Sequence, residues 1–209
     1  MAQRVAMLGF VVALALTQAG GCNDDDDDDS SGSVLPAPPC GTNPPYPGSG
    51  GDGSNGATLT YPNGHPKNWL TTDAPALTNE DEILTLVNGR RCAMGLNVLV
   101  MDVSMRQCAR GHSRHMREDY HAPTFFAHDN PEGDSPGARM TANGVSWTLA
   151  AENIAAGYVT PTDAFNEWMG SPGHRANIER SGITRTGVGY QPGAPGDTYG
   201  TYWTQVFAN

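Results

Sequence analysis

Two residue types able to carry chemistry stand between Ala151 and Ile178. Glu152 lies beside Asn153 in a short apolar stretch, and His174 follows within the sequence SPGHRANI. A carboxylate and an imidazole can exchange protons with a substrate or share a metal ion. They can also form a buried hydrogen-bonded pair that only holds loops together. Because the two residues lie in separate segments, the fold must bring them together.

Three stretches of the chain carry a recognisable pattern. They are Asp102-x-x-Met105-x-x-x-Ala109-x-x-His112-Ser113, then AENIAAGYVTPTDAFNEWMGSPGHRANI from position 151, and YWTQVF from position 202. In this order they resemble the CAP superfamily (cysteine-rich secretory proteins, antigen 5 and pathogenesis-related 1, with the SCP domain), in its bacterial secreted branch. The resemblance covers residues 77–209. It implies an α+β fold, a three-layer α-β-α sandwich with a central, mostly antiparallel sheet.

The resemblance also implies a cleft that gathers histidines and acids. Its first histidine matches His128, and its acid matches Glu152. Where other members have a second acid and a second histidine, this chain has Ser171 and Tyr202, which we expect as polar neighbours. The bacterial pattern offers His174 as a replacement histidine. The candidate site implied by the resemblance is therefore His128, Glu152 and His174.

Several interpretations of this site compete. His128, His174 and Glu152 could bind a divalent metal such as zinc, with a water as fourth ligand, although the chain has no HExxH helix. The same residues could perform metal-free acid–base chemistry. Alternatively, Glu152 and His174 form a structural pair. We expect Ser171 to cap a short helix rather than act as a nucleophile. Asn153 is expected to tie loops together, or alternatively to contact a ligand.

Three functions fit these interpretations. The first is a secreted or surface-anchored binding module for a small apolar or lipid-like ligand or a protein partner. The second is a metal-assisted hydrolase acting on peptides or cell-envelope material. The third is a structural surface protein with a vestigial site. The sequence alone leaves open whether the protein is an enzyme.

The N-terminal third is predicted to direct and tether the domain. Residues 1–21 contain a short apolar run, typical of a secretory signal and too short to span a bilayer. The cysteine of Gly20-Gly21-Cys22 resembles the lipidated residue of a bacterial lipobox, although Ala19 departs from that pattern. Residues 22–75 are acidic and rich in Pro, Gly and Ser, which predicts a disordered linker. Residues 76–209 are predicted to form one domain, so contact with the membrane is expected only through the lipid anchor.

Charge narrows the choice of partner. The whole chain has a net charge of −10, and much of the excess comes from the aspartate run 24–29. The domain has no basic stripe, which makes nucleic acid and anionic membrane surfaces poor partners.

The chain has four cysteines. Cys92 and Cys108 both lie in predicted helices, which the family resemblance places side by side. We therefore predict a disulfide between them, which a secreted protein permits. The alternative is a pair of buried reduced thiols.

Periodicity predicts helices followed by strands. Helices are expected to start near Thr78, Asp102, Ser135 and Thr160, where capping residues or proline occur, with Gly95 as one stop. His112 lies on the apolar face of the second helix and is expected to be a core histidine. Strands are expected over 186–190 and 199–207.

Overall fold

The computed structural model describes residues 15–17, 74–118, 126–193 and 196–209. Most of the predicted signal segment, Cys22 and residues 22–73 of the predicted linker lie outside the described residues. The elements are, in chain order, β1 (Ala15–Thr17), α1 (Ala74–Ala93), β2 (Val100–Met101), α2 (Val103–Glu118), α3 (Pro136–Ala142), β3 (Leu149–Ala156), α4 (Pro161–Gly170), α5 (Pro172–Ile178), β4 (Arg185–Pro192) and β5 (Thr201–Ala208).

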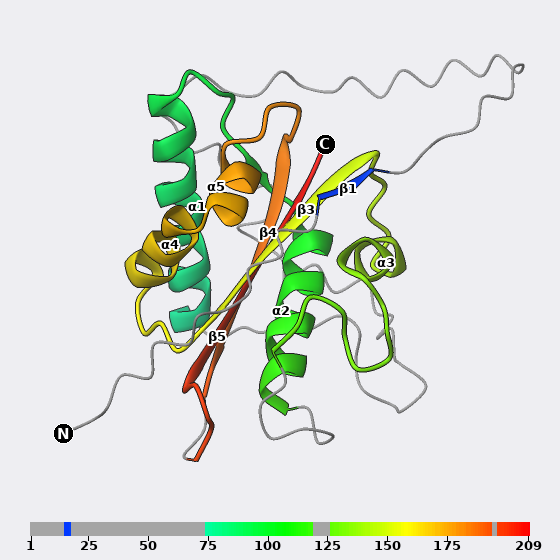
Figure 1. Ribbon diagram of the computed structural model, residues 1–209, viewed down its shortest axis with the longest axis vertical. Helices are drawn as coiled ribbons and strands as arrows, with labels where there is room; N and C mark the ends of the chain where they lie inside the picture. Colours follow the sequence, from blue (N-terminus) through cyan, green and yellow to red (C-terminus); the bar gives the residue numbers. More distant parts are fainter. Residues whose placement is uncertain (1–14, 18–73, 119–125, 194–195) are drawn as a thin grey trace, which may run out of the picture.

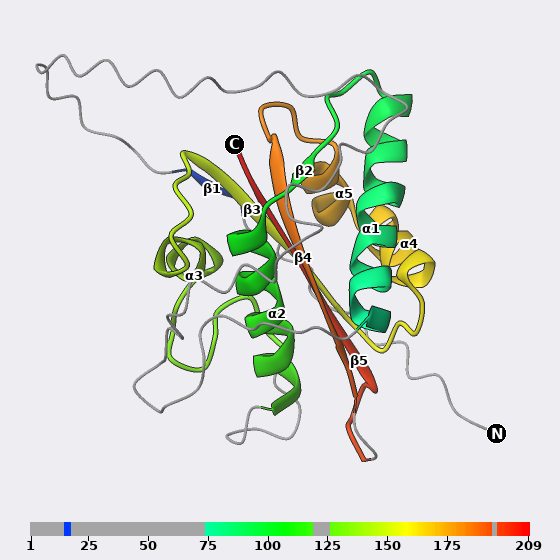
Figure 2. The same cartoon turned by 180° about the vertical axis from the view of Figure 1, so that it is seen from behind.

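The strands form one sheet in the order β1-β3-β5-β4-β2. Its pairs are antiparallel except β2 with β4, which is parallel. Helices α1, α4 and α5 cover one face, and α2 and α3 cover the other (Figure 1, Figure 2). Each face has its own apolar cluster, one around Trp168 and Trp203, the other around Met105 and Val206. The α+β sandwich with a mostly antiparallel sheet is confirmed.

The predicted helix starts are set by local capping. The Asp102 carboxylate accepts a hydrogen bond from the backbone N–H of Met105 at 3.0 Å. Ser135 and Thr160 cap α3 and α4, each followed by a proline in the first turn. These side chains satisfy backbone donors that the first turn of a helix leaves unpaired.

Helix α1 differs from the prediction at its start. It begins at Ala74, four residues before Thr78, so Glu80 lies inside the helix rather than in its first turn. The Glu80 side chain is fully buried. Its carboxylate is used in a contact with another helix rather than in capping.

Two glycines let α2 lie directly on the sheet. A Cβ atom added to Gly187 would lie 2.1 Å from the backbone of Met105. One added to Gly189 would lie 2.3 Å from the backbone of Ala109. The two glycines share one face of β4, so any side chain there would push the helix away from the strand.

The predicted bridge between Cys92 and Cys108 is wrong. Cys108 is a buried free thiol. Cys92 is disulfide-bonded, and because Cys108 is free, its partner lies outside the described residues. The reason is topological: α1 and α2 cover opposite faces of the sheet (Figure 1). Their ion pairs involve Glu80 and Asp81 in the first half of α1, whereas Cys92 lies at its far end. The expected side-by-side packing of the two helices, which would have brought the cysteines together, is therefore wrong.

Among the described residues, no helix has both the length and the apolar character needed to cross a membrane.

Candidate functional site

Strand β3 carries the centre of the candidate site. Neighbouring residues of a strand point to opposite faces of the sheet. Glu152 lies opposite Val206, which belongs to the apolar cluster on the α2 and α3 side. Asn153 therefore points to the face covered by α5, where its amide contacts that helix. The candidate residues thus approach β3 from both layers of the sandwich.

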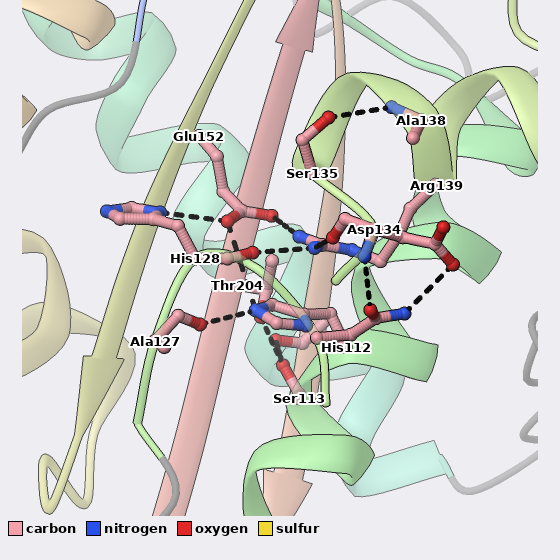
Figure 3. A network of polar contacts seen from close by, with 12 residues as sticks. His112, Ser113, Ala127, His128, Asp134, Ser135, Ala138, Arg139, Glu152 and Thr204 are labelled. Atoms are coloured by element: carbon pink, nitrogen blue, oxygen red, sulfur yellow. Dashed lines mark hydrogen bonds and ion pairs between the residues drawn. The ribbon is translucent and has the colours of Figure 1, made fainter. Parts of the chain in front are cut away.

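The Glu152 carboxylate is fully buried and has two strong partners. Arg139 Nη2 lies 2.5 Å from its Oε2, and His128 Nδ1 lies 2.9 Å from its Oε1. Figure 3 shows the two side chains reaching the carboxylate from opposite sides. Burial alone would raise the pKa of Glu152, but the charge of Arg139, the neighbouring His112 ring and the His128 hydrogen bond lower it to about 2. The carboxylate is therefore ionised at neutral pH.

The backbone around His128 is held from two directions. Arg139 Nη1 donates to the carbonyl oxygen of His128 at 2.6 Å. His112 Nε2 donates to the carbonyl oxygen of Ala127 at 3.0 Å (Figure 3). The His128 side chain is 17% exposed, and its Nε2 makes no hydrogen bond to a described residue. Only this end of the ring is left to meet a ligand.

His112 is a core residue, as its place on the apolar face of α2 predicts. It is fully buried, and its Nε2 lies 3.9 Å from Glu152 Oε1. Burial and the nearby charge of Arg139 lower its pKa to about 3, so the ring is neutral at pH 7. Its Nδ1 has no hydrogen-bond partner among the described residues.

His174 lies on α5, at the edge of β3. Ser171 caps this helix, as predicted: its Oγ accepts from the backbone N–H of His174 at 3.5 Å. The Asn153 amide donates to the carbonyl oxygen of His174 at 3.1 Å. Burial lowers the pKa of His174 to about 4; the neighbouring His128 ring, when protonated, acts in the same direction, and Glu152 acts in the opposite direction. His174 is therefore near both other members of the candidate site, without a direct hydrogen bond to either.

One expected neighbour, Tyr202, lies farther along the sheet. Tyr202 pairs with Ala156, four residues along β3 from Glu152, or roughly 13 Å at the usual rise of a strand. It packs with Met116 and Ile154 and is 3% exposed. Asn153 is fully buried and ties α5 to the sheet, as one of its two interpretations predicts.

Comparison with known proteins shows the family of this chain. The family described as CAP, the cysteine-rich secretory protein family, matches residues 84–207. The chain belongs to this family. The Bacillus subtilis protein YkwD is 36% identical over 139 residues, which cover 66% of this chain and 50% of that protein. The Bacillus subtilis membrane protein YlbC is 36% identical over 112 residues, 54% of this chain and 31% of that protein. The chain thus spans half or less of the length of these relatives.

Solved structures give the same family and fold. An extracellular protein with an SCP domain from Bacillus anthracis is 31% identical, with a TM-score of 0.57, covering 68% of this chain and 44% of that one. An outer surface protein of Borrelia burgdorferi has a TM-score of 0.55 at 18% identity, covering 62% of this chain and 90% of that one. The second likeness concerns the fold alone.

The CAP domain's candidate residues do not fit a three-ligand zinc site as they lie. Both oxygens of Glu152 face other partners, Arg139 and His128. Within residues 74–118, 126–193 and 196–209, no three His, Cys, Asp or Glu side chains are placed to bind a metal ion. Zinc binding therefore stays a prediction, which metal analysis of the purified protein, with and without chelator, tests.

Arg139, the main partner of Glu152, was not predicted from the sequence. An arginine in a seven-residue helix resembles a surface residue, yet it is 2% exposed. The sequence gives little indication of its role: Arg139 is a single cation on α3, between the helix start at Ser135-Pro136 and Gly144. Arg139 and Glu152 are 13 residues apart on different elements, so neither helix nor strand periodicity indicates that they meet.

A small pocket of about 160 Å³ lies apart from these residues, between the end of α1 and the start of β4. Buried Arg91 lines it and donates to the carbonyl oxygens of Asn97, Ile178, Arg180 and Ile183. With four carbonyl acceptors, Arg91 is a structural link between α1 and the segment before β4.

Proposed function

We propose that the protein is a secreted or surface-anchored binding module that holds a small amphipathic ligand at the edge of β3. The ligand's polar group contacts His128, and its apolar part lies against Phe126. The observation that carries this proposal is the half-buried His128 ring, fixed at Nδ1 by Glu152 and unbonded at Nε2 to any described residue. Such a fixed polar group beside exposed apolar surface is typical of small-molecule sites.

The apolar side of the proposed site is aromatic. Phe126 is 41% exposed, one of few large apolar side chains left in contact with water among the described residues. Its ring centroid lies 6.0 Å from that of Tyr199, and Tyr199 meets Tyr202 edge to face at 5.9 Å. Phe126 is two residues from His128 in the sequence, so one ligand can reach both. Aromatic surfaces of this kind favour ligands with rings or chains.

The neutral fluorescent amphiphile N-phenyl-1-naphthylamine is a suitable probe. Titrated into the full chain, it is expected to gain fluorescence on binding. Phe126→Ala and His128→Gln should each weaken its binding about tenfold, since each removes one of the two contacts. Val159→Ala, at a side chain that is 72% exposed, is the control and should bind like the wild type. Equal affinity in all four proteins would refute the proposal.

The proposed location, outside the cell or anchored to its surface, follows from the relatives and the N-terminal sequence. The extracellular SCP-domain protein of Bacillus anthracis supports secretion, and Cys22 supports a lipid anchor. Mass spectrometry of the mature N-terminus tests the anchor. A diacylated Cys22 is expected, whereas a free Gly20 amine followed by an unmodified Cys22 would exclude it.

A hydrolase is the second candidate, favoured by the carboxylate–imidazole pair. An ionised Glu152 behind His128 would let Nε2 take a proton from a water molecule. Ser171 is used as a helix cap, so the nucleophile would be that water. Assays on peptides and purified cell-envelope material test this function. Hydrolysis that disappears in His128→Gln would support it, and no turnover by the wild type would remove it.

A further inference from the structure

Arg139 is the buried cation on which the candidate site converges. Its guanidinium contacts the Glu152 carboxylate and the carbonyl oxygens of His128 and Asp134, the last at 2.9 Å. The Cys108 thiol also lies beside it, and burial raises the pKa of that thiol to about 12, so the thiol is neutral. One side chain thus joins α3, β3 and the segment that carries His128.

The first consequence concerns the His128 ring. A carboxylate paired with a guanidinium stays ionised and can only accept hydrogen bonds. His128 Nδ1, 2.9 Å from that carboxylate, must therefore carry the ring proton and donate it. A neutral imidazole has one donor and one acceptor nitrogen. Nε2 is then left with a lone pair and no proton.

The second consequence concerns the backbone of His128. Arg139 Nη1 donates to the carbonyl oxygen of His128. Arg139 Nη2 donates to Glu152, whose carboxylate in turn positions the His128 ring. The ring and the backbone of His128 are therefore fixed by the same guanidinium. A lysine side chain has a single nitrogen and lacks the planar fork with which Nη1 and Nη2 reach the two groups separately.

We propose that Arg139 is the positioning residue of this site: it fixes His128 as a hydrogen-bond acceptor, so the ligand's contacting group is a neutral donor such as a hydroxyl or an amide N–H. The ligand class rests on the proposed function, while the role of Arg139 does not. An ionised carboxylate or phosphate group has no proton to donate, so it makes no hydrogen bond to the lone pair at Nε2 and is repelled by it.

The first experiment measures the His128 tautomer directly, by ring-nitrogen chemical shifts in the isotope-labelled full chain near pH 7.5. In the wild type, Nδ1 is expected to be protonated and Nε2 bare. In Arg139→Gln, the two nitrogens should move toward the averaged shifts of a ring that exchanges between tautomers. Arg139→Lys keeps the charge and is expected to be intermediate.

Arg110→Gln is the matched control. Arg110 is a second buried arginine paired with a glutamate, 6% exposed, and it contacts Glu80 rather than Glu152. It should destabilise the fold without moving the His128 signals. A protonated Nε2 in the wild type, or equal changes in the Arg139 and Arg110 variants, would overturn the role of Arg139. If Arg139→Gln does not fold, the lysine variant decides.

The second experiment compares three compounds that share one ring: benzyl alcohol, benzyl methyl ether and benzoate. Binding is followed by the shift of the His128 signals. Benzyl alcohol is expected to bind at least about fivefold more tightly than the ether, which lacks the donor. Benzoate should bind more weakly still, and an equal or higher affinity for it would overturn the ligand class. If none of the three binds, the proposed function fails, while the tautomer measurement still decides the role of Arg139.

Discussion

Beyond the short outer strands β1 and β2, the sheet ends at β3 and β4, and each of these two edges buries a glutamate against arginine. The two edges differ in what the buried glutamate contacts. At the edge of β4, Glu80 of α1 meets Arg110 of α2. At the edge of β3, Glu152 meets Arg139 of α3 and two histidines. The comparison separates what a buried ion pair does for the fold from what it can do for a ligand.

At the β4 edge, the Glu80 carboxylate has all of its contacts within the protein fold. Arg110 donates to both oxygens of Glu80, at 2.8 and 2.6 Å. The backbone N–H of Tyr190 donates to the same carboxylate at 3.2 Å. Tyr190 lies on β4, past the two residues of that strand that pair with β2. Arg106 adds a second cation and also contacts Asp81. The carboxylate links α1 and α2 across the strand edge, and each of these groups has a structural use.

The β3 edge is closed only in part. The Asn177 amide donates to the carbonyl oxygen of Glu152 at 3.2 Å, and Trp168 Nε1 donates to that of Ile154 at 3.1 Å. These side chains cover the backbone of the edge. The Glu152 side chain is shared with His128, whose far nitrogen is left without a bond to the described residues. His128 is therefore linked to the buried Glu152–Arg139 ion pair, and it presents Nε2 as a polar atom that a ligand can reach.

The largest effect is expected from Glu80→Ala. It leaves the buried guanidinium groups of Arg110 and Arg106 without their carboxylate, so the free energy of unfolding should fall by about 3–5 kcal/mol. Urea denaturation measures this. The His128 signals of the folded variant should match those of the wild type. Glu82→Ala, at an exposed residue of the same helix, should change stability by less than about 0.5 kcal/mol. A loss below about 1 kcal/mol for Glu80→Ala would contradict the closed-edge interpretation.

The edges should also respond differently to acid. In the folded state, the pKa of His112 is lowered from 6.5 to about 3, and that of His174 from 6.5 to about 4. The unfolded chain therefore takes up these protons first, and the stability they contribute is complete above pH 6.5 and lost as pH falls toward 4 and 3. Glu152 adds a loss between pH 4.5 and about 2. Burial raises the pKa of Glu80, which has the opposite sign: its contribution is lost as pH rises through the folded pKa.

Urea denaturation at pH 7, 6, 5 and 4 checks this prediction. Each buried histidine can contribute a slope of at most about 1.4 kcal/mol per pH unit below pH 6.5, so the two together set an upper limit of about 7 kcal/mol by pH 4, and a loss of several kcal/mol is expected. His112→Gln should flatten the profile, and Glu80→Gln should keep the downward slope. A wild-type profile that is level between pH 7 and 5 would show that the two histidines are not buried in their neutral form.

The elements that position both edges were predictable where local chemistry sets them. Asp102, Ser135 and Thr160 cap their helices as predicted, because a cap depends only on the next few residues. Strand β3 was not predicted as a strand. Its sequence, LAAENIAA, has no alternation, since it is covered on both faces and nearly all of its residues are buried.

The contacts between distant segments were predictable only through the family resemblance, and then incompletely. His128 and Glu152 meet, although they are 24 residues apart. Arg139 was missed because its partner is chosen by the fold rather than by spacing. The helix start expected near Thr78 did not single out Glu80, whose burial depends on a helix from the opposite layer. The wrong cysteine pair has the same cause, since the side of the sheet on which a helix packs leaves no local signal.

A smaller effect is expected from Asn177→Ala, which opens the backbone cover of the β3 edge. The variant loses hydrogen bonds to the Glu152 carbonyl oxygen and, at 2.9 Å, to Asn153 Oδ1. The free energy of unfolding should fall by about 1–3 kcal/mol, because buried acceptors lose their donor. Hydrogen exchange should speed up in α5, the helix that carries His174. Ala176→Ser, at an exposed position of α5, is the control. Unchanged exchange in Asn177→Ala would mean that α5 is held by its other contacts.

The smallest effect on stability, and the sharpest test of the open edge, is expected from Phe126→Ala. The ring is 41% exposed and contacts Tyr199, so its removal should lower the free energy of unfolding by less than about 1 kcal/mol. If the edge of β3 is a ligand site, the same change weakens binding of N-phenyl-1-naphthylamine about tenfold while leaving the His128 tautomer unchanged. Phe126 would then matter for binding and little for folding, unlike the groups described at the β4 edge, which have structural uses. A loss of more than about 2 kcal/mol would instead assign Phe126 to the core. Both edges of the sheet would then be structural, and the binding proposal would lose its apolar half.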